Sequence, residues 1–263
     1  MRILDHGRGA IAILAAGLIG AGCGRSRGAD SPTTNTATFD VVARWPHDPQ
    51  AFTQGLVFYA GRFYESTGLN DSSSVREVEP RTGRVLRQVR LASQHFGEGL
   101  ALAGDRLVQL TWKSHIAFVY RRSTLETVDT FRYQGEGWGL AFDGRRFIRS
   151  DGTNRLRLHD PVTFAEVGSV DVQDQGVPVQ GLNELEIVRG ELWANVYPSD
   201  WIVRIDPSTG AVRGWIDART LYPPDQRPPT ADVLNGIAYD SASDRIFVTG
   251  KRWPVVFEVR LRQ

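Results

Sequence analysis

The hairpin pattern of this chain is clearest in one stretch, Glu98-Gly-Leu-Ala-Leu-Ala-Gly-Asp-Arg-Leu-Val-Gln-Leu-Thr-Trp112. Two short apolar runs flank the pair Gly104-Asp105, and a glycine there supplies the positive φ that a tight hairpin turn favours. The stretch therefore predicts a strand, a tight turn and a second strand that returns beside the first.

The same hairpin pattern recurs four more times along the chain. The other copies begin at Gln54-Gly55-Leu56, Trp138-Gly139-Leu140, Asn183-Glu184-Leu185 and Asn235-Gly236-Ile237. Together with the strands predicted after it, each copy fills roughly 40–50 residues, which is the size of a propeller blade. We therefore predict an all-β fold, a five-bladed β-propeller, because a β-sandwich would not explain five copies of one hairpin.

One further strand pattern lies outside the repeats, at Phe39–Arg44. The last repeat ends with Val255–Leu261 as its third strand and lacks an outer one. Pairing of these two segments would complete the last blade and remove an exposed sheet edge. We therefore predict a propeller closed by an N-terminal strand that joins the last blade.

The first residues of the chain have the layout of a secretory signal. An apolar run over residues 10–22 follows Arg2 and Arg8, and it is too short to span a bilayer. The run ends in Gly20-Ala21-Gly22-Cys23, which is similar to a bacterial lipoprotein processing site; the alternative is ordinary cleavage beside a chance cysteine. We expect export to the cell envelope or periplasm, with a membrane contact only through a lipid on Cys23.

These observations divide the chain into three parts. We predict a signal peptide over residues 1–23, a flexible tether over 24–37 and a catalytic domain over 38–263, because the tether composition has no apolar period.

Charge and composition exclude several classes of function. The 31 basic and 30 acidic residues are scattered along the chain, so no nucleic-acid partner is expected. The histidines show no metal-ligand spacing, Cys23 is the only cysteine, and neither a nucleophile elbow nor a phosphate-binding loop is present. We expect carboxyl, amide, ammonium and indole groups to carry the chemistry, in a monomer without metal or cofactor.

The predicted fold brings the starts of the five innermost strands to one face of the channel. The residues that precede each Gly-Leu step would converge there: Gln54, Glu98, Trp138, Asn183 and Asn235. The returning strands end near the same mouth, at Glu65, Thr67, Trp112, Asp151, Tyr197 and Lys251. Aromatic walls around a few converging polar groups are typical of a small-ligand pocket.

Structural roles are open for most of these residues. The aromatic side chains could pack between blades, the asparagines could cap strand ends, and Lys251 could be a solvated surface charge. Glu98 is different, because it is the only carboxyl among the five entrance residues and lies two residues from Phe96. An acid near apolar rings has a raised pKa, which suits proton transfer.

Several longer motifs resemble the plant and bacterial type of glutaminyl-peptide cyclotransferase. They are His47-Asp-Pro-Gln-Ala-Phe-Thr-Gln-Gly-Leu56, Phe96-Gly-Glu-Gly-Leu100, Leu110-Thr-Trp112, Gly137-Trp-Gly-Leu140, Leu182-Asn-Glu-Leu-Glu186, Trp193-Ala-Asn-Val196, Leu234-Asn-Gly-Ile-Ala238 and Val248-Thr-Gly-Lys251. The resemblance covers residues 39–261. It implies a metal-independent five-bladed propeller that converts the N-terminal glutamine of peptides or proteins to pyroglutamate and releases ammonia.

The resemblance also implies roles for individual residues. Glu98 would move a proton from the attacking amine to the leaving ammonia, while Gln54, Asn183 and Lys251 would bind the amide oxygen, the amine or the first peptide bond. The pocket would be walled by Phe52, Phe96, Trp112, Trp138 and Tyr197. The family often has tryptophan in place of Tyr197, and Trp201 is a nearby aromatic that could compensate.

Two other interpretations of the pocket stay open. A surface-anchored propeller could bind peptide N-termini without turning them over. A metal-dependent, lactonase-like propeller would need a cluster of acidic ligands in the channel, which a single entrance carboxyl among amides and indoles does not provide.

Overall fold

The computed structural model describes residues 34–262. The predicted signal peptide, Cys23 and most of the predicted tether lie outside the described residues. The first strand, β1 (Thr36–Pro46), begins two residues before the predicted start of the domain. It does so because Thr36, Ala37 and Thr38 pair in parallel with a later strand, β19.

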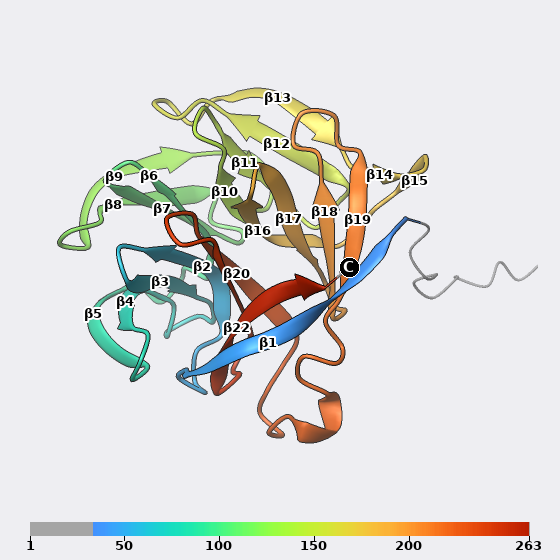
Figure 1. The fold of residues 1–263 in the computed structure, drawn as a ribbon. Coiled ribbons are helices and arrows are strands. Elements are labelled where there is room, and N and C mark those ends of the chain that lie inside the picture. The colour runs from blue at the N-terminus through green and yellow to red at the C-terminus, as the bar shows by residue number, and fades with distance from the viewer. Residues whose placement is uncertain (1–33, 263) are drawn as a thin grey trace, which may run out of the picture. The chain divides into compact units, whose positions relative to one another are not determined.

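The described residues form an all-β, propeller-like fold (Figure 1). Three sheets have four strands each. The first contains β2 (Thr53–Tyr59), β3 (Arg62–Thr67), β4 (Ser74–Glu79) and β5 (Arg84–Arg90), and the second contains β6 (Gly97–Ala103), β7 (Arg106–Thr111), β8 (Ile116–Arg121) and β9 (Glu126–Arg132). The third contains β10 (Leu140–Phe142), β11 (Phe147–Arg149), β12 (Arg155–His159) and β13 (Glu166–Asp171). An eight-stranded sheet has the order β16 (Leu182–Val188), β17 (Glu191–Val196), β18 (Trp201–Ile205), β19 (Val212–Asp217), β1, β22 (Val255–Arg262), β21 (Arg245–Gly250) and β20 (Leu234–Asp240). The remaining elements are the small hairpin β14 (Gln173–Asp174) and β15 (Val177–Pro178) and the 3-10 helix η1 (Pro224–Gln226).

All five predicted hairpins are present as antiparallel pairs. They are β2/β3, β6/β7, β10/β11, β16/β17 and β20/β21. Two of their turns have positive φ at both central residues, Ala60-Gly61 and Arg189-Gly190, as the tight-turn prediction required. The first strands of the hairpins contact one another in a closed order, β2, β6, β10, β16, β20 and back to β2.

The apolar core is divided in the same way. Five buried clusters of described residues each contain side chains from two neighbouring sheets or halves of the long sheet. For example, Phe58 and Phe63 of the first sheet pack against Phe247 of β21, with ring centroids 4.8 and 5.1 Å apart. Each sheet therefore buries both faces against its neighbours.

The predicted closure by the N-terminal strand is confirmed. β1 pairs antiparallel with β22, with Phe39 opposite Leu261 and Arg44 opposite Phe257. The parallel pairing of β1 with β19 was not expected from sequence, and it joins two groups of strands into the eight-stranded sheet.

A buried charged cluster ties the first sheet to the turn after β21. Glu65 accepts hydrogen bonds from His47 Nε2 at 2.9 Å and from Arg76 Nε at 2.8 Å, and His47 Nδ1 lies 2.6 Å from the carbonyl of Trp253. Burial opposes the charge of Glu65, but Arg76 and His47 hold the pKa of that carboxyl well below its ordinary value. Burial would likewise lower the pKa of His47, and Glu65 with the Trp253 carbonyl raises it above the ordinary value.

We expect Glu65→Gln to destabilise the domain by about 3–5 kcal/mol, because buried His47 loses its counter-charge and buried Arg76 keeps only the partly exposed Asp48, at 2.8 Å. Glu126→Gln is a matched control, since Glu126 pairs with Arg121 at an exposed site and should cost about 1 kcal/mol or less. Urea unfolding measures both. Equal losses in the two variants would contradict the assignment.

Candidate active site

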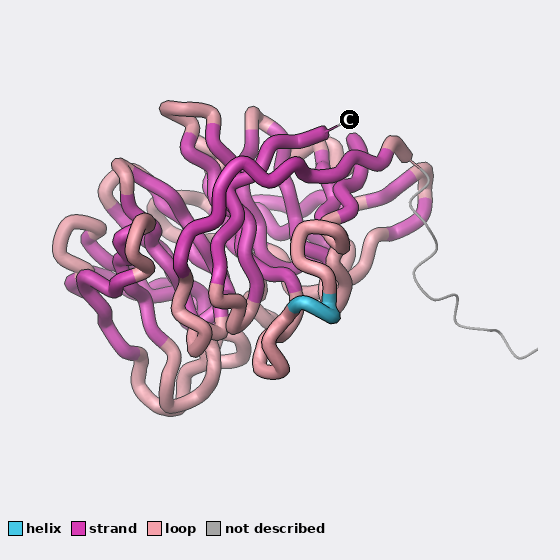
Figure 2. The backbone as a smooth tube through the Cα atoms, turned by 60° about the horizontal axis from the view of Figure 1, so that its bottom comes forward, coloured by secondary structure: helices cyan, strands magenta, loops and turns pink. Residues whose placement is uncertain are grey.

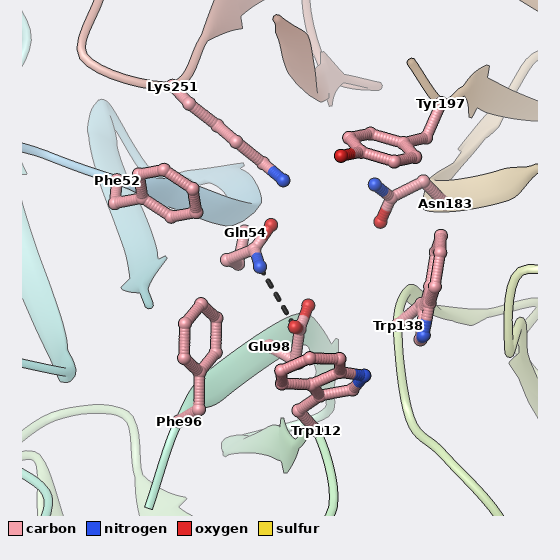
Figure 3. A pocket seen from close by; sticks show the side chains of 9 residues that line it. All are labelled: Phe52, Gln54, Phe96, Glu98, Trp112, Trp138, Asn183, Tyr197 and Lys251. Atoms are coloured by element: carbon pink, nitrogen blue, oxygen red, sulfur yellow. Dashed lines mark hydrogen bonds between the residues drawn. The ribbon is translucent and has the colours of Figure 1, made fainter. Parts of the chain in front are cut away.

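Nine side chains enclose a cavity of about 230 Å³ at the starts of the inner strands (Figure 3). They are Phe52, Gln54, Phe96, Glu98, Trp112, Trp138, Asn183, Tyr197 and Lys251. These are the same nine residues that the sequence nominated for the pocket. Their individual roles stay predictions.

Backbone irregularities occur at four of the five entrance residues. In four hairpins the strand pairing shifts its register at the entrance residue, which is Gln54, Glu98, Asn183 or Asn235. Such β-bulges re-aim a side chain and bend the strand. The glycine that follows is required by close packing, because a Cβ on Gly99 would lie 2.5 Å from the backbone nitrogen of Leu140.

Glu98 is held by a chain of carboxamides. Gln54 Nε2 donates to Glu98 Oε1 at 2.9 Å, and Gln54 Oε1 accepts from Asn235 Nδ2 at 3.1 Å. Asn235 also donates to the carbonyl of Thr53 at 2.9 Å and is fully buried. Both ends of the Gln54 amide are therefore fixed, and one carboxyl oxygen of Glu98 is left without a hydrogen bond from residues 34–262.

Lys251 faces Glu98 across the cavity (Figure 3). Each residue is only 5% exposed. Burial raises the pKa of Glu98 well above its ordinary value, against the lowering effect of Lys251 and with a further rise from Glu136. Burial also lowers the pKa of Lys251, while Glu98 and Asp232 oppose that shift. The pKa of Glu98 and the pKa of Lys251 are therefore both shifted toward neutral pH.

The aromatic walls form an almost continuous ring around these polar groups. Phe52 meets Phe96 edge-to-face at 6.1 Å, and Phe96 meets Trp112 at 5.7 Å. On the other side Trp138 and Tyr197 meet edge-to-face at 5.8 Å. The Lys251 ammonium bridges the two groups, lying 4.8 Å from the ring of Phe52 and 5.3 Å from that of Tyr197.

Glu136 closes the opposite gap in the ring and was missed by sequence reasoning. Its Oε2 accepts the indole N–H of Trp112 at 2.6 Å and that of Trp138 at 2.9 Å. Lys113 pairs with its other oxygen at 3.5 Å. Glu136 stands in a loop between two repeats, outside the entrance pattern, and only its place two residues before Trp138 could have drawn attention to it.

Asn183 has an unused acceptor. Its Oδ1 is buried without a hydrogen-bond partner in the described part of the chain. A buried acceptor of this kind costs about 1–3 kcal/mol, which a donor on a bound ligand would offset. The neighbouring Glu184 has a structural role instead, because it accepts the backbone N–H groups of Leu56 and Ile237 and so braces three inner strands.

Other residues expected at the mouth lie elsewhere. Asn235 stands behind Gln54, and Glu65 belongs to the buried charged cluster. Asp151 pairs with Arg157 at 3.2 Å. Trp201 packs edge-to-face on Trp215 and is absent from the cavity wall, so it does not compensate for Tyr197.

The described residues contain neither a metal-ligand cluster nor a membrane-spanning helix. Within residues 34–262, no group of three or more His, Cys, Asp or Glu side chains is placed to hold a metal ion. No helix in the same range is long and apolar enough to cross a membrane.

The fold and the pocket define the class of protein: an all-β, propeller-like protein with one pocket in which an acid, an ammonium group and carboxamides converge. The family model for glutamine cyclotransferase matches residues 13–261. The chain is 46% identical over 231 residues to a glutaminyl-peptide cyclotransferase of Arabidopsis thaliana, covering 85% of this chain and 71% of that protein. The crystal structure of Myxococcus xanthus glutaminyl cyclase matches with a TM-score of 0.81 and 42% identity, covering 86% of this chain and 97% of the other.

The chain therefore belongs to the glutamine cyclotransferase family, which confirms the resemblance noted from its motifs. Its activity is that of an acyltransferase that cyclises N-terminal glutamine.

Proposed function

We propose that this domain cyclises the N-terminal glutamine of peptides or proteins without a metal ion, with Glu98 as the proton shuttle. The observation that carries the proposal is the buried pair of Glu98 and Lys251 on opposite sides of one cavity. We further infer that the domain is a five-bladed propeller, in which the eight-stranded sheet counts as two blades. The five hairpins and the closed order of their first strands support that count.

The cavity suits a glutamine side chain folded back on its own amine. The substrate's ammonium group would lie between the free oxygen of Glu98 and Asn183 Oδ1, both acceptors. The side-chain amide oxygen would face the Lys251 ammonium, which stabilises negative charge as it develops on that oxygen. Because the attack is intramolecular, fixing this folded conformation removes much of the entropic barrier.

A single carboxyl is sufficient for all the proton transfers of this reaction. Glu98 takes one proton from the substrate ammonium, and the freed amine forms a bond to the side-chain amide carbon. The ring nitrogen then holds an extra proton, and the leaving nitrogen needs one. Glu98 gives its proton to the leaving nitrogen, the C–N bond breaks, and the carboxylate takes the surplus proton from the ring. The products are the lactam and ammonia, which leaves as ammonium after receiving that last proton.

The metal-free part of the proposal is tested with a coupled ammonia assay on a Gln-Ala dipeptide before and after chelator dialysis. We expect equal rates. Loss of activity that returns with added divalent cation would support the lactonase-like alternative instead. Saturable peptide binding without ammonia release would support the binding propeller.

The Glu136 bridge is expected to position substrate-binding walls. Glu136→Ala removes the shared acceptor of two indoles and should raise KM about tenfold, with a smaller effect on kcat. Glu136→Gln keeps an acceptor oxygen and should restore most of the affinity. Steady-state kinetics on Gln-Ala measures both, and identical KM values in the two variants would show that the indoles do not depend on this acceptor.

The acid limb of kcat/KM should report Glu98. The carboxylate form is active, so the rate rises with pH through the Glu98 pKa, above the ordinary value of about 4.3. Since the negative charge of Glu136 raises that pKa, Glu136→Gln should move the acid limb to lower pH. An acid limb at the ordinary glutamate pKa in the wild type, or a shift of the limb toward higher pH in Glu136→Gln, would refute the assignment of the limb to Glu98.

We also propose export and lipid attachment at Cys23, on the layout of the leader alone. Palmitate labelling of whole cells is expected to mark the wild-type protein and to be lost in Cys23→Ala. A labelled Cys23→Ala protein would refute the attachment site.

A further inference from the structure

A second cavity has a volume of about 390 Å³. Its walls include Pro198, Asp200, Pro224, Arg227, Asp232 and Val233. We refer to it as the proline groove.

Two residues that line the active-site pocket are direct neighbours of residues that line the proline groove. Pro198 directly follows Tyr197, which lines the pocket. The backbone N–H of Lys251 donates to the carbonyl of Val233 at 3.0 Å, and the N–H of Asp232 donates to the carbonyl of Lys251 at 2.9 Å. One wall of the groove is therefore hydrogen-bonded to the residue that faces Glu98.

The loop that builds the groove is an addition to the repeat. The connection between β19 and β20 comprises residues 218–233, whereas the connection between β5 and β6 comprises only residues 91–96. This longer connection carries the short helix η1 (Figure 2, cyan). Loops well beyond the usual length that stand at an active site are commonly functional.

The groove has one carboxylate without an ion-pair partner among the described residues. Asp200 is neutralised by Arg227 at 2.7 Å. Asp232 is exposed and has no ion-pair partner in the described range; its Oδ1 accepts only the backbone N–H of Val233, at 2.7 Å. Two basic side chains stand near the pocket residues: Lys113 pairs with Glu136 at 3.5 Å, and the Arg252 guanidinium lies 5.7 Å from the ring of Phe52.

We propose that the proline groove binds the peptide beyond its first two residues and that Asp232 selects substrates with a basic side chain at the third position. The inference rests on the proposed function, because the pocket holds one glutaminyl residue and the rest of the peptide must leave through its mouth. Proline rings offer a rigid apolar surface without N–H groups, which suits an extended peptide.

Turnover of three peptides tests the selection: Gln-Ala-Lys, Gln-Ala-Glu and the dipeptide Gln-Ala, which has no third residue. In the wild type we expect kcat/KM for the lysine peptide to exceed that for the glutamate peptide about three- to fivefold, the scale of an exposed ion pair. Asp232→Asn should bring the ratio close to one, and Asp232→Lys should invert it. High salt should reduce the wild-type ratio.

Asp129→Asn is the matched control. Asp129 is also exposed and accepts the backbone N–H of the next residue, at 2.7 Å, but it lies on β9. The ratio of kcat/KM for the lysine peptide to that for the glutamate peptide should be the same in Asp129→Asn as in the wild type. A wild-type ratio near one, or a ratio unchanged in Asp232→Asn and Asp232→Lys, would overturn the proposal.

Binding separates this proposal from the proposed function. Tryptophan fluorescence titrations of Glu98→Gln with the two tripeptides, with and without Asp232→Asn, measure the preference without turnover. The lysine peptide should bind about three- to fivefold more tightly, and only when Asp232 is present. Failure of Gln-Ala to release ammonia would overturn the proposed function, while equal affinities for the two tripeptides would overturn the groove.

Discussion

Glu98→Gln is expected to lower kcat for ammonia release by about 10²- to 10⁴-fold, the usual contribution of a positioned acid–base group. A carboxamide cannot carry the proton from the attacking amine to the leaving nitrogen. Its oxygen can still accept from Gln54 Nε2, which donates to Glu98 Oε1 at 2.9 Å in the wild type. The pocket should therefore keep its shape, and KM should change only a few-fold.

Thermal unfolding of Glu98→Gln serves as the control, and its transition should stay at or above that of the wild type, because a buried acid is replaced by a neutral group. A folded variant that retains near wild-type turnover would contradict the shuttle role. Glu98→Asp is a useful intermediate, since it keeps the acid but shortens its reach.

Lys251→Met is expected to lower kcat by about 10²- to 10³-fold, comparable to the loss of an oxyanion donor. Methionine keeps an apolar stem between Phe52 and Tyr197 while removing the ammonium group. The same change removes the positive charge that lowers the Glu98 pKa, so the acid limb of kcat/KM should also move to higher pH.

Kinetics of Lys251→Met on Gln-Ala over a range of pH separate the two effects. If Lys251 only tuned Glu98, activity would recover at higher pH. We expect the loss to persist at every pH, because the developing oxyanion no longer has a cation opposite it. Full recovery at high pH would contradict oxyanion stabilisation by Lys251.

The hairpins were predictable because they depend on local pattern, and the closure was predictable because the repeats left one strand unpaired and one blade incomplete. Glycine turns and short apolar runs are recognised directly, and an orphan strand at Phe39–Arg44 has one open edge to fill. Seven of the nine pocket residues followed from placing equivalent repeat positions at one face, and the other two, Phe52 and Phe96, were implied by the family resemblance. The structure adds register shifts of the strand pairing at Gln54, Glu98, Asn183 and Asn235, which bend the inner strands there.

What the sequence did not predict depends on contacts between distant segments. Glu136 matters through two indoles that lie in different sheets or loops, so no repeat position marks it. Asn235 shares the entrance pattern but is turned onto Gln54, because its amide satisfies the carbonyl of Thr53 as well. The parallel pairing of β1 with β19 likewise joins residues far apart in the chain.

The central claim is that Glu98 titrates in the range where the enzyme works. The most direct test is a pH titration of the glutamate side-chain carboxyl carbons by NMR in ¹³C-labelled protein, with the Glu98 signal assigned as the one missing from Glu98→Gln. We expect its midpoint to lie well above the ordinary glutamate value and to coincide with the acid limb of kcat/KM. A Glu98 signal that titrates at the ordinary value, with the acid limb elsewhere, would contradict the account.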